Sequence, residues 1–464
     1  MVDYCDLNTI NLFKRDSISN IRGNVDFQIT GNTVDDLKGT INITDLLYTN
    51  PKDNYFFKDF NITSSFADSL RTITINSSEI IEGEVVGKFK FNEVVKLTQN
   101  SIGSIFSNYT PYETESGQKI DFQFKIYNKI IEVFNPEISV AANTVIKGEI
   151  SSNDNLFKLN IKSPKIIAYE NAINKLNIQI DNRNPLFNTQ LSIDEFESDI
   201  YNLSDLHLFN ITLNDTLYFR TEFKGGIGKT EDFDLSFYQT FNKNNKSVVG
   251  IQKSKVNFKN NDWILNPEDN LSNNIIYDNK TSKLIINPFL IDSGNQNIQF
   301  SGHVTDSTST DLKFKFNNVN LANVTPEIDS LNLEGLINGA INYSQKNKLI
   351  KPTGNLIVSN FNINNSHQGD LKIDIEGKST TAYNLEVSLI RNSLESLKAT
   401  GLIDFQPKKP TIDVNVAFNE FKLDAFSPLG EDIFTNIKGL AYGEAAITGL
   451  LENPKMDGDL FLDN

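Results

Sequence analysis

The sequence predicts an all-β fold, a long, curled and twisted sheet with a few short helices. Apolar residues recur at every second position through most of the chain, as in Asp121–Tyr127 and Thr411–Phe418. Such alternation gives each strand one apolar face and one polar face. Turn-forming residues separate these segments roughly every ten to twenty residues, and few windows have the spacing of a helix.

The last segment, residues 437–464, shows the unit that recurs. Asn453-Pro454 predicts a turn between two strands, because proline restricts its own backbone and that of the preceding residue. Glycines punctuate the flanking segments where the backbone must bend or approach closely: Gly439, Gly443, Gly449 and Gly458. We therefore expect a strand–turn–strand unit, with weaker versions upstream.

The window 92–109 breaks the alternation and predicts a helix. Two further windows, 321–330 and 423–433, are expected to form short helices, helical caps or turns. Elsewhere we see no composition break or linker, and we expect residues 1–464 to form a single continuous elongated β-repeat region. About 30 strands spaced about 4.8 Å apart would extend roughly 140 Å. A sheet of that length must twist and curl. The expected architecture is thus a β-taco, a solenoid-like meander whose apolar face lines a groove.

The charge, cysteine content and hydropathy of the sequence exclude several classes of protein. The 464 residues carry a formal net charge of -16, and no Lys/Arg cluster offsets it, so nucleic acid binding is not expected. Cys5 is the one cysteine, which excludes a disulfide framework within this sequence. The segment after Met1 lacks the pattern of a signal peptide, and no window approaches roughly 18 apolar residues. Because Asn464 lies inside a repeat, we expect a fragment of a longer protein.

No catalytic, cofactor or metal site is predicted. Gly225–Thr230 ends like a phosphate-binding loop, but the first glycine of that pattern is Phe223 here and a strand follows, so we expect a tight turn. The histidines, His207, His303 and His367, have no second ligand at metal-binding spacing. Clustered carboxylates such as Glu79, Glu82 and Glu84 fit a solvated strand face, and Trp263 fits a packing position. We expect no enzyme and no cofactor.

The alternating segments instead predict an apolar strip. Side chains at every second position share one face of a strand, so the strip is defined by one face of four segments. A strip that an open, curled sheet leaves partly uncovered would hold an apolar ligand. The residues expected to line this groove are Phe122, Phe124, Ile126, Leu312, Phe314, Phe316, Leu371, Ile373, Ile375, Ile412, Val414, Val416 and Phe418.

Several segments, taken in order, resemble one known family. They are Asp215–Gly226, Asp262–Pro267, Asn295–Gly302, Leu331–Tyr343, Lys351–Val358 and Ile437–Asn464. Together they are similar to the repeat of TamB proteins of the Bacteroidetes type, the translocation and assembly modules related to AsmA. The resemblance implies a periplasm-spanning curled sheet with an apolar interior, linked to lipid transport and outer-membrane biogenesis in the cell envelope of a Gram-negative bacterium. The inner-membrane anchor and the contacts with an outer-membrane barrel would lie in parts outside this sequence.

Three function classes stay open. The first is a non-enzymatic conduit for the acyl chains of phospholipid between inner and outer membrane. The second is a scaffold for translocation and insertion of outer-membrane or secreted β-barrel proteins, which would offer strand edges. The third, more distant, is an extracellular β-solenoid that binds glycans on exposed aromatic platforms. The sequence identifies neither the lipid, nor the direction of transport, nor the partner.

Overall fold

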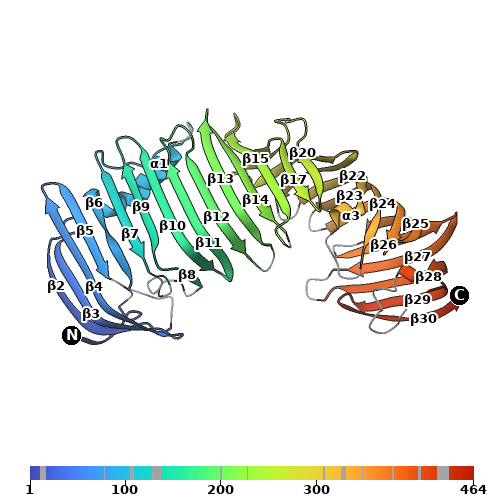
Figure 1. The fold of residues 1–464 in the computed structure, drawn as a ribbon, viewed down its shortest axis with the longest axis horizontal. Coiled ribbons are helices and arrows are strands. Elements are labelled where there is room, and N and C mark those ends of the chain that lie inside the picture. Colours follow the sequence, from blue (N-terminus) through green and yellow to red (C-terminus); the bar gives the residue numbers. More distant parts are fainter. Residues whose placement is uncertain are drawn as a thin grey trace. The chain divides into compact units, whose positions relative to one another are not determined.

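A computed structural model describes residues 1–10, 17–77, 79–104, 109–127, 131, 133, 135, 137–198, 201–226, 228–306, 309–325, 331–346, 349–378, 381–405, 409–425 and 438–463. About 70% of the protein is β-strand, in 30 strands of a single antiparallel sheet (Figure 1). The predicted fold class is confirmed. The strands form because β-branched and aromatic residues alternate with polar ones along them.

Contacts divide the chain into two compact units, Met1–Asp234 and Leu235–Asn464. The boundary falls within β15 (Glu231–Phe241). The single continuous repeat region expected from the sequence stays a prediction.

Unit 1 is an antiparallel meander in which most strands pair with their neighbours in sequence. Two short strands share one partner, because β9 pairs with the first half of β10 and β8 with its last residues. The strands are β1 (Val2–Asp6), β2 (Asn20–Thr30), β3 (Lys38–Thr49), β4 (Asn54–Ala67), β5 (Leu70–Ser77), β6 (Ile81–Lys88), β7 (Lys119–Ile126), β8 (Ile138–Val140), β9 (Thr144–Ser151), β10 (Leu156–Ala168), β11 (Asn171–Asp181), β12 (Thr189–Glu197), β13 (Leu203–Leu213) and β14 (Thr216–Gly225).

Unit 2 continues the same topology with one interruption. Two broken strands, β16 with β17 and β18 with β19, lie between the long strands β15 and β20. The strands are β16 (Ser247–Ile251), β17 (Ser254–Phe258), β18 (Asn261–Leu265), β19 (Asn274–Asp278), β20 (Lys283–Ser293), β21 (Gln296–Asp306), β22 (Ser309–Asn320), β23 (Leu333–Lys346), β24 (Leu349–Ile363), β25 (Ser366–Gly377), β26 (Ala382–Arg391), β27 (Leu394–Asp404), β28 (Thr411–Lys422), β29 (Leu440–Leu450) and β30 (Asn453–Asp463).

Helices are short and occupy the predicted windows in part. The window 92–109 contains the 3-10 turn η1 (Phe91–Glu93) and α1 (Val94–Gly103). The window 321–330 contains α3 (Leu321–Val324), whose first turn is capped by the side chain of Asn320. Residues 105–108, 326–330 and 426–433 of the three predicted windows lie outside the described residues.

The C-terminal hairpin forms as expected, but its turn does not lie at Asn453-Pro454. Leu450 pairs with Asn453, so the turn is Leu451-Glu452 and Asn453-Pro454 begins β30. Proline cannot donate to a sheet ladder, and Pro454 lies near the start of β30, opposite Gly449 of β29, where strands tolerate it. The proline signal marked the hairpin correctly and misplaced its turn by two residues.

A recurring β-bulge, which the alternation of apolar residues does not predict, shapes the strands. At five places, two residues of one strand lie opposite one residue of its partner, and one of the two has a positive φ. For example, Asn317 and Asn318 lie opposite Asn338. The third residue of each tetrapeptide has a φ between 50° and 57°, a left-handed conformation that Asn and Asp tolerate best. The tetrapeptides are Ile43–Leu46, Leu203–Leu206, Phe316–Val319, Val358–Phe361 and Phe418–Phe421.

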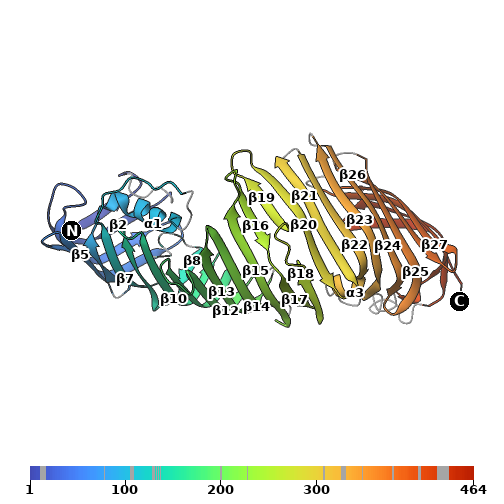
Figure 2. The ribbon, with the colours of Figure 1, turned by 90° about the horizontal axis from the view of Figure 1, so that it is seen from above.

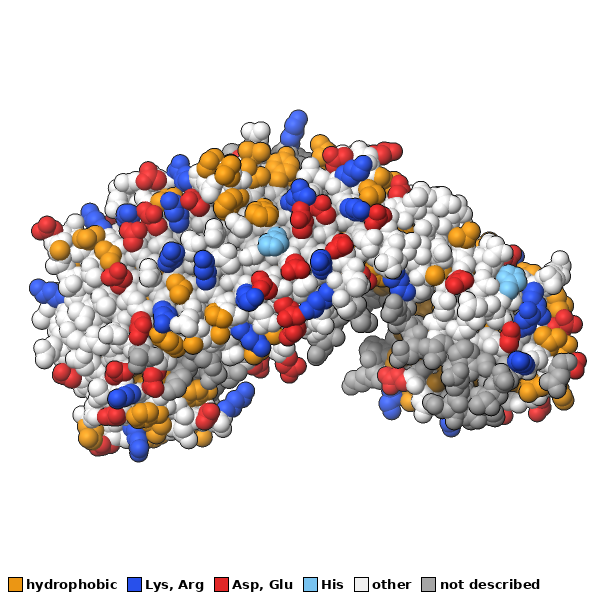
Figure 3. Space-filling view, viewed as in Figure 1, with side chains coloured by type: hydrophobic (Ala, Val, Ile, Leu, Met, Phe, Trp, Pro, Cys, Tyr) orange, Lys and Arg blue, Asp and Glu red, His pale blue; other side chains and the backbone are white. Residues whose placement is uncertain are grey.

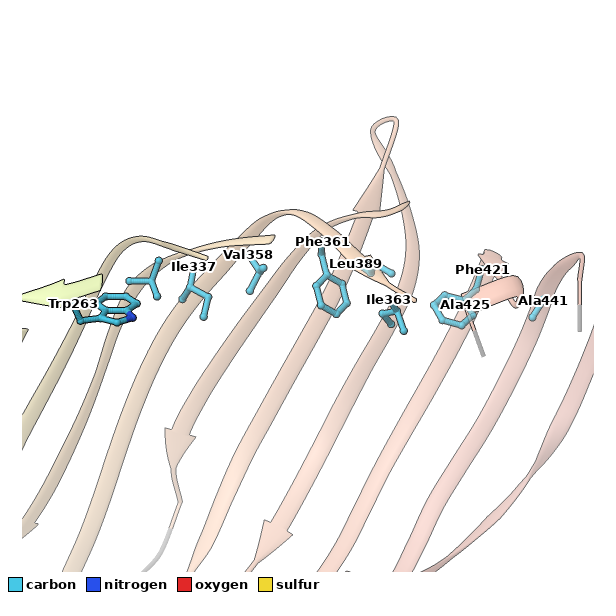
Figure 4. Packing of buried hydrophobic residues seen from close by; sticks show 10 residues of the cluster. Trp263, Ile337, Val358, Phe361, Ile363, Leu389, Phe421, Ala425 and Ala441 are labelled. Atoms are coloured by element: carbon cyan, nitrogen blue, oxygen red, sulfur yellow. The ribbon is translucent and has the colours of Figure 1, made fainter. Parts of the chain in front are cut away.

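The bulges have a clear consequence for packing. A three-residue step in a regular strand would turn the second apolar residue to the polar face. The extra residue restores it to the apolar face, where Val319, Phe361 and Phe421 become buried, with exposures of 0%, 7% and 5%. Together with Trp263 they form a cluster that crosses the strands at one level (Figure 4). We call this cluster the rim core of unit 2. Its buried members are Trp263, Val319, Ile337, Val358, Phe361, Ile363, Leu389, Phe421, Ala425 and Ala441.

The bulge at Asn360 gives a testable prediction. Asn360→Val should lower the free energy of unfolding of unit 2 by about 1–3 kcal/mol, because a β-branched residue at φ 53° is strained. Trp263 is the one tryptophan of the sequence and is buried in the rim core, so urea unfolding followed by its fluorescence reports on this unit. Asn360→Gly is the control, because glycine adopts this conformation freely. Equal destabilisation by both variants would contradict the proposed role of the bulge.

Candidate functional site

The apolar face of unit 2 carries three parallel rows of side chains that cross the sheet. Each row joins residues directly opposite one another on successive strands from β21 or β22 to β28 or β29. The rim row is Val319, Ile337, Val358, Leu371, Leu389, Leu397 and Phe418. The central row is Ile298, Phe316, Gly339, Leu356, Ile373, Val387, Ala399, Val416 and Ala445. The distal row is Phe300, Phe314, Ile341, Gly354, Ile375, Leu385, Gly401, Val414 and Ile447.

Every position in these rows is apolar or glycine, so they form an uncharged band. Burial differs along it. The rim row is largely buried, as Val319, Val358 and Leu389 show, because it belongs to the rim core. Most of the distal row is only half-buried, and Phe314 is 37% exposed although its ring stacks on Phe300 at 4.5 Å. The band is therefore closed at the rim and open farther along the strands.

The structure brings the predicted groove residues of unit 2 together. The rim row contains Leu371 and Phe418, and the other two rows contain Phe314, Phe316, Ile373, Ile375, Val414 and Val416. The next position beyond the distal row contains Leu312 and Ile412. The alternating residues between them, such as Lys313, Lys372 and Asp413, are exposed on the opposite face. Whether this face holds a lipid stays a prediction.

In unit 1, the predicted residues Phe122, Phe124 and Ile126 lie on β7 and share one face. The two Phe rings lie over glycines of neighbouring strands, Phe122 over Gly148 and Phe124 over Gly83. A Cβ atom at Gly148 would lie 2.5 Å from the Phe122 ring, and one at Gly83 would lie 2.7 Å from the Phe124 ring. A side chain at either glycine would displace its ring, so the glycines make room for large aromatic groups on this face.

Helix α1 covers one end of the apolar face of unit 1. Leu97 is 2% exposed and packs with Ile120, Ile150 and Phe157 from β7, β9 and β10. Figures 1 and 2 show α1 beside the ends of these strands. The cover reaches the predicted strip, because Phe122 packs against the same cluster. At this end of unit 1, protein side chains already occupy the apolar surface.

The opposite face is charged and solvated. In Figure 3 the basic and acidic side chains are interspersed over the visible face of unit 1. Cross-strand ion pairs such as Lys119–Glu149 and Lys158–Asp181 account for part of this pattern, with N–O distances of 3.1 Å and 3.6 Å. Exposed pairs of this kind contribute little to stability. Their effect is to keep this face in water and the other face available for packing.

Arg71 is an exception on the apolar side of unit 1. It lies opposite Gly87 at the end of the sheet near α1 and is 5% exposed. Its guanidinium donates to the carbonyl oxygens of Val34 at 2.9 Å and Leu37 at 3.0 Å, and lies over the Phe91 ring, 5.0 Å from its centroid. Burial lowers the pKa of Arg71. These hydrogen bonds from Arg71 therefore hold the loop between β2 and β3 against the end of the sheet.

We expect Arg71→Met to lower the free energy of unfolding by about 2–4 kcal/mol, because buried carbonyl groups would lose charge-assisted hydrogen bonds. Urea unfolding followed by far-ultraviolet circular dichroism measures the change. The control is Arg220→Met, which removes exposed ion pairs to Glu222 and Asp234 and should cost about 1 kcal/mol or less. Similar losses in the two variants would rule out a special role for Arg71.

The glycine segment Gly225–Thr230 is a turn between strands, as predicted, although residue 227 lies outside the described residues. It joins β14 to β15, so no helix N-terminus follows it. The ammonium group of Lys229 pairs with the carboxylate of Glu195 and lowers the pKa of that carboxyl. The Tyr201 hydroxyl donates to Glu231 at 3.2 Å, and burial raises the pKa of Tyr201 to about 12. These contacts fix the turn.

The histidines, the tryptophan and the clustered carboxylates considered in the sequence lie on the surface or in the packed core. His207, His303 and His367 are exposed, and Trp263 is buried at 5% in the rim core, as predicted. Within the described ranges, no group of three His, Cys, Asp or Glu side chains is placed to hold a metal ion. Among the predicted carboxylates, Glu82 accepts a hydrogen bond from Tyr127 at 3.3 Å and Glu84 is exposed.

Neighbouring groups lower the pKa of the Asp278 carboxyl in unit 2. Lys246 lies 3.0 Å from Asp278, and the backbone N–H of Lys280 donates to the same carboxylate at 3.0 Å. These hydrogen bonds lower the pKa of Asp278 from 3.8 to about 2. Because the folded pKa is depressed, this carboxylate stabilises the fold above pH of about 4, and the contribution is lost as the pH falls toward 2.

Lys246→Met should raise the pKa of Asp278 toward its ordinary value and move acid unfolding of unit 2 to higher pH. The carboxyl carbon shift of Asp278, followed by NMR against pH, measures this directly. Lys255→Met is the control, because Lys255 pairs with Asp262 instead. An unchanged Asp278 titration in Lys246→Met would contradict the assigned cause.

No protein-family model matches the sequence, and no curated protein matches it. Across the ranges that the structure describes, no helix has the length and apolar character needed to cross a membrane.

Proposed function

We propose that this chain is a non-enzymatic groove protein of the TamB/AsmA-like type that supports phospholipid transport between the inner and outer membranes. The observation that carries the proposal is the uncharged band of unit 2, because most of its distal row is only half-buried and Phe314 is exposed. A continuous exposed apolar surface is costly in water and marks a binding surface. A lipid acyl chain fits such a surface without directed hydrogen bonds.

The energetics favour acyl chains over polar ligands. Burial of each CH₂ group contributes about 0.8 kcal/mol, so a chain lying along several strands gains appreciably. Arg71, a charged residue on the apolar side of unit 1, is bonded to protein carbonyls and is not exposed to a ligand. In this proposal the protein works in the periplasm and is anchored through segments outside this sequence.

The second candidate is a scaffold for the assembly of outer-membrane β-barrel proteins. This candidate would use the backbone edge of a strand instead of the apolar band. A strand with an unpaired edge can accept another strand through backbone hydrogen bonds. The two candidates differ in the surface used, the open band or a strand edge.

Neighbouring residues on opposite faces of β22 provide the test. Phe314→Asp should block lipid passage, because it places a charge in the band, where desolvation is costly. Lys313→Glu, which changes a charge on the exposed face, should be tolerated. In the intact protein, photo-crosslinkers at position 314 should label lipid analogues and those at 313 should not.

The outcomes separate the candidates. Equal labelling from both positions, or labelling from neither while the protein still supports the envelope, would reject the groove and favour the scaffold. Mass spectrometry of lipid that co-purifies with the chain gives an independent check. Recovery of phospholipid from the wild type but not from Phe314→Asp is the expected result.

A further inference from the structure

Three hairpin tips of unit 1 and the C-terminal end of α1 border an open polar hollow. The tips are residues 152–155, 182–188 and 214–215, and the hollow has a volume of about 450 Å³. It lies at the strand ends and is distinct in chemistry from the apolar band. Its lining consists of Ser104, Asn155, Asn182, Arg183, Asn188, Thr212, Asn214 and Asp215.

Hydrogen bonds fix the walls of this hollow. The Asn182 side chain donates to the carbonyl oxygens of Ser101 at 3.1 Å and Asn155 at 2.6 Å, and accepts from the N–H of Phe157 at 2.9 Å. One amide group thus ties α1 to two hairpin tips. The Asn188 side-chain oxygen accepts from the N–H of Thr212 at 2.6 Å, which joins the third tip. The lining is therefore held in place before any ligand arrives.

The hollow also holds unused hydrogen-bonding groups. The Thr212 hydroxyl oxygen is buried and has no hydrogen-bond partner among the described residues. Three side-chain amides also have groups that lack partners among the described residues. Neither the amides of Asn155 and Asn214 nor the Nδ2 group of Asn188 makes a hydrogen bond to these residues. A buried hydroxyl without a partner is costly and uncommon in proteins. A ligand with several hydroxyl groups would satisfy it.

We propose that this hollow binds a neutral saccharide. Four of the eight lining residues are asparagines. The amides of Asn155 and Asn214 each offer a donor and an acceptor, and that of Asn188 offers a donor, as vicinal sugar hydroxyls require. The lining has one cation, Arg183, and one anion, Asp215, so it favours neither an anionic nor a cationic ligand. The volume is within the usual range of small-molecule sites. This inference is independent of the acyl-chain proposal.

Ligand titration of the full chain tests the chemistry. Saturation-transfer NMR with glucose, N-acetylglucosamine and maltose should show binding of at least one of these sugars. Inorganic phosphate and calcium chloride serve as charged probes and should not compete with it. Binding of phosphate or calcium in place of sugar would overturn the proposal, and so would binding of none of the probes.

Two substitutions locate the site without disturbing the backbone. Asn155 and Asn214 have φ angles of 47° and 48°, which glycine adopts without strain. The double variant Asn155→Gly/Asn214→Gly removes two amides and should weaken sugar binding roughly tenfold or more. Asn143→Gly is the matched control, since its φ is 68° and it lies outside the hollow. Equal loss in control and double variant would overturn the assignment.

Thr212→Val separates binding from folding. Valine has nearly the shape of threonine and lacks the hydroxyl, so without sugar the urea midpoint should be unchanged or raised. Sugar binding should weaken roughly tenfold, because the buried hydroxyl is the group that a ligand satisfies. Unchanged binding in both Thr212→Val and the double variant would show that sugar binds elsewhere and would overturn the proposal.

Discussion

The structure depends on one constraint, that each strand keeps its apolar residues on the same face of the sheet. A one-residue slip would move a whole set of side chains to the solvent. The bulges satisfy this constraint where the sequence steps by three residues, as from Val358 to Phe361. With a bulge, a strand can bend and still place a buried residue, such as Phe361, in the rim core. The rows of the apolar face and the closed rim both follow from this register.

Residues that break the alternation have identifiable roles. Arg71 lies among apolar residues because it fastens a loop over the end of the sheet. Gly443 occupies the position opposite Phe418, where a Cβ atom would lie 2.1 Å from the carbonyl oxygen of Asp459. Close approach of the backbones is possible there because glycine has no side chain and tolerates its φ of +118°. Small and charged residues thus set the shape of the sheet, and apolar residues fill it.

The alternation predicted the fold class and the shared face of residues such as Phe314 and Ile373, because period two follows directly from strand geometry. It did not predict the bulges, since the tetrapeptide Phe316–Val319 looks like the end of a strand. The signal was nevertheless present, as an apolar step of three residues with Asn, Asp or Glu before the second apolar residue. The polar hollow could not be predicted from the sequence, because Asn155, Asn188 and Asn214 are far apart in sequence and come together only at the hairpin tips.

The meander topology bears on how the chain folds. Most strands pair with their neighbours in sequence, so each new hairpin closes a short loop at low entropic cost. A sheet of this kind can grow strand by strand as the chain emerges from the ribosome, with each added hairpin using the previous strand as its template. The broken strands β16 to β19 interrupt this order, because β15 and β20 must come together through two separate pairs. Growth of the sheet should therefore pause at this point.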